Sequence, residues 1–218
     1  MSRRLAVIAI VFATAASVSG CAELYRSFGP PEAWKSRQVT FGISPRTHYY
    51  GLLSKDANIE HWSILGLARR GDAESVPGIA LALKPGVTPS PLVRSTAAVA
   101  LAMLGDPRAI PHLEEACKDP SPLVRADAVD ALGALGGPAQ TPMLARVLAS
   151  DRDARVRLHA ARALARLGGR EAVAALIAHL GDADESVSFE CRRSLATISG
   201  RDLAPRTAVW TEWMEENT

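Results

Sequence analysis

The chain has 218 residues, of which 48% are hydrophobic, 5% aromatic and 22% charged, and its formal net charge is +2. This balance is typical of a globular protein, so it excludes a wholly disordered chain and a many-pass membrane protein. Because Arg3 and Arg4 supply both surplus charges within a segment that we expect to be removed, the mature chain is nearly neutral, which disfavours nucleic-acid binding.

The N-terminal residues have the organisation of a secretory signal peptide. A basic start at Arg3 and Arg4 is followed by an apolar run over residues 5–18, and Cys21 comes shortly afterwards. This run is too short to span a bilayer, which needs roughly 20 apolar residues, so it predicts the hydrophobic region of a signal peptide. We therefore place the signal peptide at residues 1–20.

The sequence Val-Ser-Gly-Cys over residues 18–21 resembles the lipobox of bacterial lipoproteins. The resemblance implies cleavage before Cys21, attachment of diacylglycerol to its sulfur and acylation of the freed amine by a fatty acid such as palmitate, which anchors a chain without a spanning helix. Because Ala22 follows the cysteine where Asp would favour the inner membrane, the resemblance implies an outer-membrane lipoprotein facing the periplasm. The alternatives are an inner-membrane lipoprotein and a secretory signal in which Cys21 is incidental.

Residues 21–55 are rich in aromatic side chains for a tether. Six of the eleven Phe, Trp and Tyr residues of the chain lie here: Tyr25, Phe28, Trp34, Phe41, Tyr49 and Tyr50. Two interpretations remain open. Either these side chains cap the open N-terminal end of the repeats that follow, or some of them dock a protein partner, because aromatic anchors dominate interaction hot spots.

A pattern that recurs every 31 or 32 residues organises residues 56–201. Equivalent valines are each followed eight residues later by a leucine, in the pairs Val93 and Leu101, Val124 and Leu132, Val156 and Leu164, and Val187 and Leu195. The apolar spacing predicts a first helix that ends at a glycine (Gly105, Gly136 or Gly168) whose conformation a β-carbon would oppose. A second helix with an early proline follows. A degenerate earlier copy brings the total to about four and a half helical hairpins.

The motif Val-Arg-x-x-Ala-x-x-Ala-Leu-x-x-Leu-Gly, at residues 124–136 and 156–168, resembles the HEAT-like repeats of the phycobilisome-lyase type. The resemblance implies an all-α fold, a right-handed α-solenoid of about four to five hairpins that bury their apolar faces on one another. Residues 202–218 depart from the repeat. Here Trp210, Trp213 and Met214 share one helix face, so we predict a C-terminal capping helix, with an aromatic ligand site as the alternative.

The recurrent charged residues and the cysteines have structural interpretations. Arginines near the start of successive first helices are matched by aspartates between hairpins, which predicts a structural ladder of Arg94, Arg125 and Arg157 with Asp119, Asp151 and Asp182. Cys117 and Cys191 occupy positions filled elsewhere by Leu or Ala, so both are expected to be small core residues.

A catalytic centre is not expected. The histidines His48, His61, His112, His159 and His179 are scattered over the chain, and each of the last four falls at a different repeat position. The sequence also lacks the common metal-binding and phosphate-binding motifs, so we predict no cofactor. The HEAT-like iron enzyme deoxyhypusine hydroxylase uses repeated His-Glu pairs as ligands, and none of these histidines is followed by Glu.

The leading functional hypothesis is a membrane-tethered scaffold for protein–protein interaction in the bacterial envelope. Candidate partner surfaces are the aromatic tether and the concave face of the second helices around Arg108, His112, Gln140 and Arg170. One alternative is a HEAT-like enzyme or enzyme subunit related to bilin lyases or deoxyhypusine hydroxylase. Another is a structural envelope lipoprotein without a dedicated partner.

Overall fold

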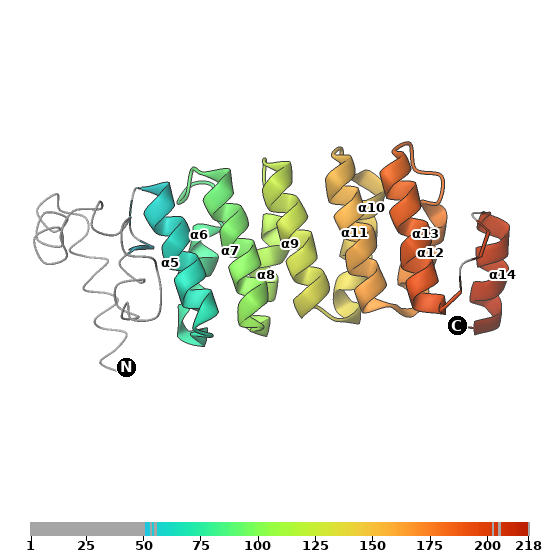
Figure 1. The fold of residues 1–218 in the computed structure, drawn as a ribbon, viewed down its shortest axis with the longest axis horizontal. Helices are drawn as coiled ribbons and strands as arrows, with labels where there is room; N and C mark the ends of the chain where they lie inside the picture. Colours follow the sequence, from blue (N-terminus) through green and yellow to red (C-terminus); the bar gives the residue numbers. More distant parts are fainter. Residues whose placement is uncertain (1–50, 53, 55, 202, 205, 218) are drawn as a thin grey trace, which may run out of the picture. The chain divides into compact units, whose positions relative to one another are not determined.

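The computed structural model describes residues 51–52, 54, 56–201, 203–204 and 206–217, all within the second of two units into which the chain divides, Ser44–Thr218. Every regular element among these residues is helical (Figure 1). The predicted all-α fold is therefore confirmed.

The helices alternate between two rows, as Figure 1 shows. The first helices of successive hairpins are α5 Ala57–Arg69, α7 Pro91–Leu104, α9 Pro122–Leu135, α11 Ala154–Leu167 and α13 Glu185–Ser199. The second helices are α6 Val76–Ala82, α8 Ile110–Ala116, α10 Thr141–Ser150 and α12 Gly169–Ala178, and the last helix is α14 Thr207–Asn217. Short 3-10 turns precede three of the second helices: η1 Ala73–Ser75, η2 Pro107–Ala109 and η3 Pro138–Gln140.

Each first helix packs against the next first helix along the row. The second helices pack against the other side of this layer of first helices. The contacts α5 with α7, α7 with α9, α9 with α11 and α11 with α13 form one row, and α10 with α12 and α12 with α14 form the other. Because α14 contacts α12 as α12 contacts α10, α14 continues the row of second helices. This arrangement is an α-solenoid of stacked hairpins.

The core consists of aliphatic side chains at equivalent repeat positions. The valines and leucines that define the repeat are completely buried: Val93, Val124, Val156, Val187, Leu101, Leu132, Leu164 and Leu195. Leu113, Leu144 and Leu176 are equally buried from the second helices. These burial values confirm the predicted repeat register.

The predicted helix ends are confirmed in position, but one differs in mechanism. Gly105 and Gly168 have φ values of 69° and 65°, in the region that a β-carbon disfavours. Gly136 instead has φ −76°, which any residue adopts. A β-carbon at Gly136 would lie 2.5 Å from the carbonyl oxygen of Leu132, so glycine is required there by close contact.

Gly133 explains how closely two of the first helices approach. It lies inside α9, and a β-carbon at this position would lie 2.6 Å from Cβ and 2.7 Å from Cα of Ala163 on α11. Real β-carbons do not make contacts this short, so the spacing between α9 and α11 depends on the missing side chain. The equivalent positions of the other copies hold alanine, as at Ala102 and Ala165.

Candidate functional site

Three arginines of α7, α9 and α11 each bind an aspartate in the loop that follows the second helix of the same hairpin. The pairs are Arg94–Asp119, Arg125–Asp151 and Arg157–Asp182. In every pair Nε and Nη2 donate to the two carboxylate oxygens over 2.7–2.9 Å. These are bidentate, charge-assisted hydrogen bonds, which are among the strongest that side chains make.

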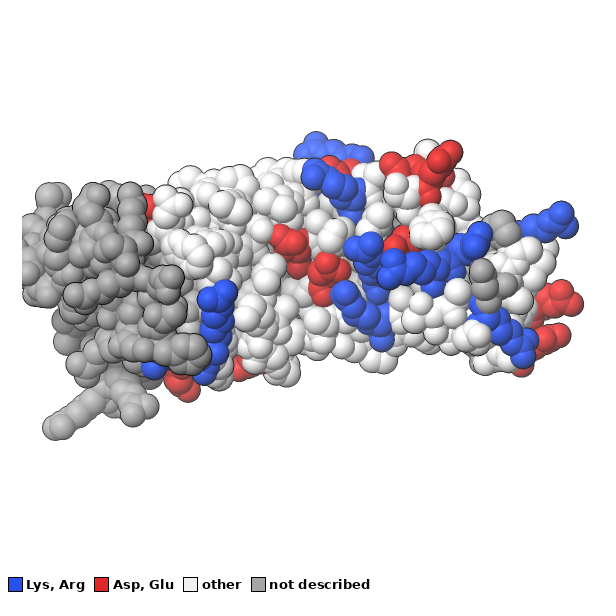
Figure 2. Space-filling view, viewed as in Figure 1, with Lys and Arg blue, Asp and Glu red and all other residues white. Residues whose placement is uncertain are grey.

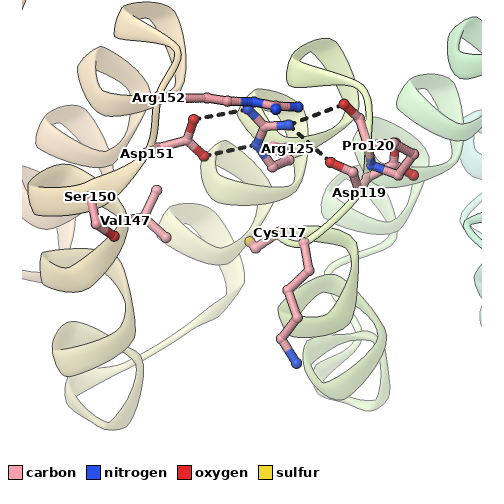
Figure 3. A pocket seen from close by; sticks show the side chains of 9 residues that line it. Cys117, Asp119, Pro120, Arg125, Val147, Ser150, Asp151 and Arg152 are labelled. Atoms are coloured by element: carbon pink, nitrogen blue, oxygen red, sulfur yellow. Dashed lines mark hydrogen bonds and ion pairs between the residues drawn. The ribbon is translucent and has the colours of Figure 1, made fainter.

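The third guanidinium nitrogen joins each hairpin to the loop before it, as Arg125 shows in Figure 3. Its Nη1 donates to the carbonyl oxygens of Asp119 and Pro120 over 2.9 and 3.3 Å. Asp151 also accepts a hydrogen bond from the backbone amide of Asp153. Arg94 and Arg157 make the same kind of bond to the preceding loops. The predicted ladder is therefore confirmed, and its side chains are occupied in holding the repeats together.

The electrostatics of the ladder favour the charged forms. Burial raises the pKa of Asp151, but hydrogen bonds from Arg125 and from the amide of Asp153 outweigh it, so the net pKa is lowered. A hydrogen bond from Arg157 lowers the pKa of Asp182. The aspartate partners in turn raise the pKa values of Arg125 and Arg157. The pairs of Arg125 with Asp151 and of Arg157 with Asp182 therefore remain ionised at neutral pH.

An open depression beside Arg125 is lined by residues of α9, of α10 and of the loops after α8 and α10 (Figure 3). Cys117 contributes a thiol to this lining, but burial raises the pKa of the thiol to about 12, so it remains protonated and a poor nucleophile at neutral pH. Lys118 pairs with Glu115 over 2.8 Å. The depression therefore offers a polar surface without an activated thiolate. Both Cys117 and Cys191 are buried and free, as their positions in the repeat predict.

A second set of polar contacts joins neighbouring first helices, and the sequence analysis missed it. His61 on α5 contacts Thr96 on α7 over 2.7 Å, and Ser95 on α7 donates to Asp127 on α9. The remaining contacts run from α9 to α11 and from α11 to α13: His159 with Asp130, Arg166 with Asp130, and Arg162 with Glu190. No pairing of residue types recurs from one helix–helix contact to the next. Repetition, the signal that identified the Arg–Asp ladder, is therefore missing here.

The two aspartates of α9 have opposite electrostatic environments. Burial raises the pKa of Asp127, and the hydrogen bond from Ser95 opposes this only in part. Burial also acts to raise the pKa of Asp130, but the contacts with His159 and Arg166 outweigh it and lower the value. The described histidines His61, His159 and His179 make separate polar contacts. His61 contacts Thr96, His159 contacts Asp130, and His179 bonds to the carbonyl oxygen of Ala175. The structure does not bring them together.

The predicted partner residues of the second-helix face are only partly available. Arg108 is exposed, yet it donates to Asp106 and to the carbonyl oxygen of Ala73 in the previous hairpin. Gln140 donates to Glu114 over 3.2 Å and accepts a bond from the amide of Gly137. His112 and Arg170 are exposed. Two of the four thus stabilise turns between repeats, and a partner-binding role for this face stays a prediction.

The predicted N-terminal sites lie outside the described residues. They are the lipidation site and the aromatic residues of the tether: Cys21, Tyr25, Phe28, Trp34, Phe41, Tyr49 and Tyr50. At the other end, Trp210 is completely buried and Trp213 is 9% exposed, with the two rings in an edge contact. Met214 is partly buried against the same core. The capping role of this helix stays a prediction.

The outward surface of the first helices carries most of the exposed large apolar side chains. Those on the helices are Trp62 of α5, Leu92, Val99 and Met103 of α7, Leu123 of α9 and Phe189 of α13, each between 41% and 60% exposed. Figure 2 shows this face: its surface over α7 is uncharged, acidic side chains lie over α9, and arginines lie over α11 and α13. Three of these side chains, Leu92, Val99 and Met103, lie on the one helix α7.

Within residues 51–217, apart from the few positions left undescribed, His, Cys, Asp and Glu form no group of three or more suited to holding a metal ion. In the same part of the chain, every helix is too short or too polar to cross a membrane.

The comparisons with known proteins agree with this architecture. A family model for HEAT repeats matches residues 51–133, 80–160 and 116–196. The complex of CpcE and CpcF of phycocyanin lyase from Nostoc sp. PCC7120 is similar in structure, with a TM-score of 0.63, 19% sequence identity, and coverage of 81% of this chain and 71% of that chain. An engineered protein gives a TM-score of 0.50 and 23% identity over 72% of this chain and 80% of its own.

Two further comparisons give weak similarity or none. Human deoxyhypusine hydroxylase aligns with a TM-score of 0.39 and 18% identity over 87% of this chain and 91% of that chain, which is too weak to support an argument. No curated protein matches the sequence. The solved structures show the fold alone, since their sequence identities are low. The family model, however, matches overlapping windows that together span residues 51–196. The chain therefore belongs to the family of HEAT-repeat proteins.

Proposed function

We propose that this chain is a lipid-anchored, non-enzymatic HEAT-repeat scaffold that binds a protein partner at the bacterial envelope. The observation that carries the proposal is the exposed apolar stripe of α7. Leu92, Val99 and Met103 are 57%, 41% and 51% exposed, on a helix whose one charged side chain, Arg94, is buried in the ladder. A surface of this kind is stabilised when a partner removes it from water.

The division of labour among the polar side chains supports a scaffold over an enzyme. The recurrent arginines and aspartates are occupied in bonds within hairpins and to the preceding loops, and the buried thiols are held protonated. Catalytic groups instead need access to substrate and a pKa matched to their task. The similarity to CpcE and CpcF also fits a binding role, because that structure is itself a complex of two proteins.

The anchor is proposed from the N-terminal sequence. A basic start, an apolar run of signal-peptide length and the lipobox-like Val-Ser-Gly-Cys point to Cys21 as the acylated first residue of the mature chain. With Ala22 after it, we place the protein in the outer membrane, facing the periplasm. Mass spectrometry of the membrane-purified protein should find acylated Cys21 at the N-terminus. An unmodified chain that begins elsewhere would refute the anchor.

The partner is sought by affinity purification from detergent-solubilised membranes. Wild-type chain should retain a protein in stoichiometric amount, and Val99→Glu should lose it, because the charge disrupts the apolar stripe of α7. The matched control is Val87→Glu, since Val87 is 53% exposed but lies in the loop before α7. Equal retention by wild type and both variants would show that the α7 stripe does not bind the partner.

A further inference from the structure

The loops that join each second helix to the next first helix lie along one edge of the solenoid, at the top of Figure 1. Three of the seven exposed large apolar side chains among the described residues lie at this edge. Val87 is in the loop before α7, and Leu92 and Leu123 are in the first turns of α7 and α9, with exposures of 53%, 57% and 42%. The described loops at the opposite edge carry none, and Met103 in the last turn of α7 is the nearest to them. The two sets of loops therefore differ in surface chemistry.

The loop that carries Val87 is an ordered insertion. The first two copies of the repeat are 34 residues apart, against 31 or 32 for the later ones, so this loop is longer than its counterparts. The amides of Val87 and Thr88 both donate to the carbonyl oxygen of Lys84 over 2.9 Å. Thr88 is buried, its hydroxyl donates to Glu60, and its carbonyl oxygen accepts a bond from Arg94. Val87 is thus exposed on a rigid turn, which loses little conformational freedom on binding.

Positive charge accompanies the apolar side chains along this edge. From the loop before α7 to the first turn of α11, the exposed cations are Lys84, Lys118, Arg152 and Arg155. The ladder aspartates of these loops are neutralised by their arginines. Outside the ladder, the carboxylates of this stretch are Glu115 and Asp153. Four cations against two carboxylates leave a net charge of +2.

The basic part of the edge ends at α11. The loop before α13 has Asp184, which caps that helix, and exposed Glu185 follows it. Figure 2 shows the change along the top of the view, from uncharged surface over α7 and α9 to arginines over α11 and acidic side chains over α13. An anionic surface that binds this edge would therefore contact the loops before α7, α9 and α11 and would be repelled by the end of α13.

The cations are too far apart to bind one small anion together. Lys84, Lys118 and Arg152 come from three successive loops. Neighbouring first helices lie about 10 Å apart, so Lys84 and Arg152 are separated by about 20 Å. A bilayer instead presents many phosphates side by side, above an apolar layer that accepts exposed aliphatic side chains. Apolar side chains combined with Lys and Arg are typical of surfaces that bind anionic membranes.

We propose that this edge docks on an anionic phospholipid bilayer, with Val87, Leu92 and Leu123 in the headgroup region and the cations against lipid phosphates. The proposal rests on the anchor of the proposed function, which brings the chain to the membrane, and goes beyond it by defining how the solenoid stands there. The first helices stand on the bilayer by their N-terminal ends. The outward face of α7 therefore remains open to a protein partner.

The test uses the full-length, lipid-anchored chain in vesicles of phosphatidylglycerol and phosphatidylcholine. A nitrobenzoxadiazole fluorophore is attached to Gly86→Cys, beside Val87, or to Gly137→Cys at the opposite edge, since a β-carbon at either glycine meets nothing within 4 Å. Cys117 and Cys191 are buried and should not react. The Gly86 probe should shift its emission to the blue and be quenched by brominated lipids, whereas the Gly137 probe should remain in water.

A pair of variants separates this edge from the surface proposed to bind protein. Val87→Glu should lower the docking equilibrium at least tenfold, because it places a carboxylate against an anionic, partly apolar surface. Val99→Glu is the matched control, since Val99 is 41% exposed on the outward face of α7, and it should leave the Gly86 probe in the bilayer. Leu92 belongs to both surfaces and is left unchanged.

A second pair tests the charge. Lys84→Gln and Arg152→Gln should each lower the docking equilibrium about fivefold, the contribution of one cation at an anionic membrane. Arg146→Gln is the control, because Arg146 is exposed in the middle of α10, away from the edge, and it should dock as wild type does. Docking should also weaken as salt is added, because salt screens exposed charges.

Three results would overturn the proposal. They are a Gly86 probe that stays in water, equal burial of this probe in vesicles of phosphatidylcholine alone, and its release by inorganic phosphate at constant ionic strength, which would indicate a site for a free anion. A chain that floats with the vesicles while its Gly86 probe stays in water would refute edge docking and leave the anchor intact. A chain that floats with neither kind of vesicle would refute the anchor itself. Retention of a protein through Val99 is measured separately in detergent and does not depend on either outcome.

Discussion

Neighbouring hairpins are joined along two lines, and the two differ in how strictly they repeat. The Arg–Asp ladder uses the same residue types, the same atoms and bond lengths of 2.7–2.9 Å at each of its steps. The contacts between first helices change at every step, from His61 with Thr96 to Arg162 with Glu190. Both sets of contacts occur in the same hairpins. The difference in how strictly they repeat therefore does not come from where a hairpin lies in the solenoid.

The difference indicates which contacts serve the fold and which make this chain individual. A contact that recurs in every copy meets a requirement of the fold itself. It satisfies the hydrogen-bonding needs of buried loop carbonyl groups and positions the next hairpin. The contacts that vary lie between neighbouring first helices, where they distinguish one part of the solenoid from another. Substitutions on the two lines should therefore have different consequences, with large losses of stability for the first and small losses for the second.

The largest expected effect is that of Arg125→Ala. This change leaves Asp151 without its guanidinium and the carbonyl oxygens of Asp119 and Pro120 without donors, and the Arg125 side chain is only 7% exposed. Removing one partner of a buried pair costs about 3–5 kcal/mol. Arg166→Ala breaks an exposed pair with Asp130 and should cost no more than about 1 kcal/mol. Urea denaturation followed by circular dichroism compares the two, and similar losses would contradict the distinction.

The aliphatic core should follow the strict repeat in the same way. Leu132→Ala and Leu164→Ala remove completely buried side chains at equivalent positions, so each should lower the free energy of unfolding by about 2–5 kcal/mol. Arg146→Ala, on the exposed side of α10, should cost less than about 0.5 kcal/mol. The same denaturation experiment measures all three, and an equal effect at Arg146 would mean that the repeat register is incorrect.

A glycine that occurs in only one copy gives an intermediate case. Gly133→Ala places a β-carbon 2.6 Å from that of Ala163, so α9 and α11 must separate, at a cost of about 1–3 kcal/mol. Gly137 is the matched control, because its β-carbon would meet nothing within 4 Å. Gly137→Ala should leave stability unchanged or raise it by up to about 1 kcal/mol. If both variants were equally stable, the spacing of α9 and α11 would be adaptable.

Repetition also explains how much could be predicted from the sequence. Four copies of one pattern identify the helices, the buried valines and leucines, and the Arg–Asp ladder, because a position that keeps its chemistry in every copy has one structural explanation. Contacts that occur once, such as Ser95 with Asp127 or Glu60 with Thr88, pair polar residues that are equally common on solvated surfaces. Their partners depend on how closely two helices approach, which the spacing of residues does not determine.

The same reasoning applies to the candidate sites. The sequence identifies Arg108 and Gln140 as exposed polar residues of the second hairpin layer, but their bonds to the carbonyl of Ala73 and to Glu114 depend on the 3-10 turns that precede the second helices. The sequence does not identify the apolar stripe of α7, because Leu92, Val99 and Met103 are residue types that are common in any helix. Their significance comes from exposure, which only the packed structure defines.

The smallest expected effect concerns acid titration, and here the two lines should differ in sign. The pKa of Asp151 is lowered in the fold, so its charge contributes stability that is fully present above the unfolded pKa of about 3.9 and is lost as the pH falls through the folded value. The pKa of Asp127 is raised by burial, so its ionisation opposes folding above the folded pKa, and this opposition disappears in acid.

At pH 7, Asp151→Asn should therefore destabilise the chain, and Asp127→Asn should stabilise it slightly, since the amide oxygen still accepts the bond from Ser95. Both differences from wild type should shrink as the pH is lowered to about 3.5, below the usual carboxyl pKa. Denaturation at the two pH values measures this, and a change of the same sign for both variants would show that the outward aspartate is held by the fold as the ladder aspartate is.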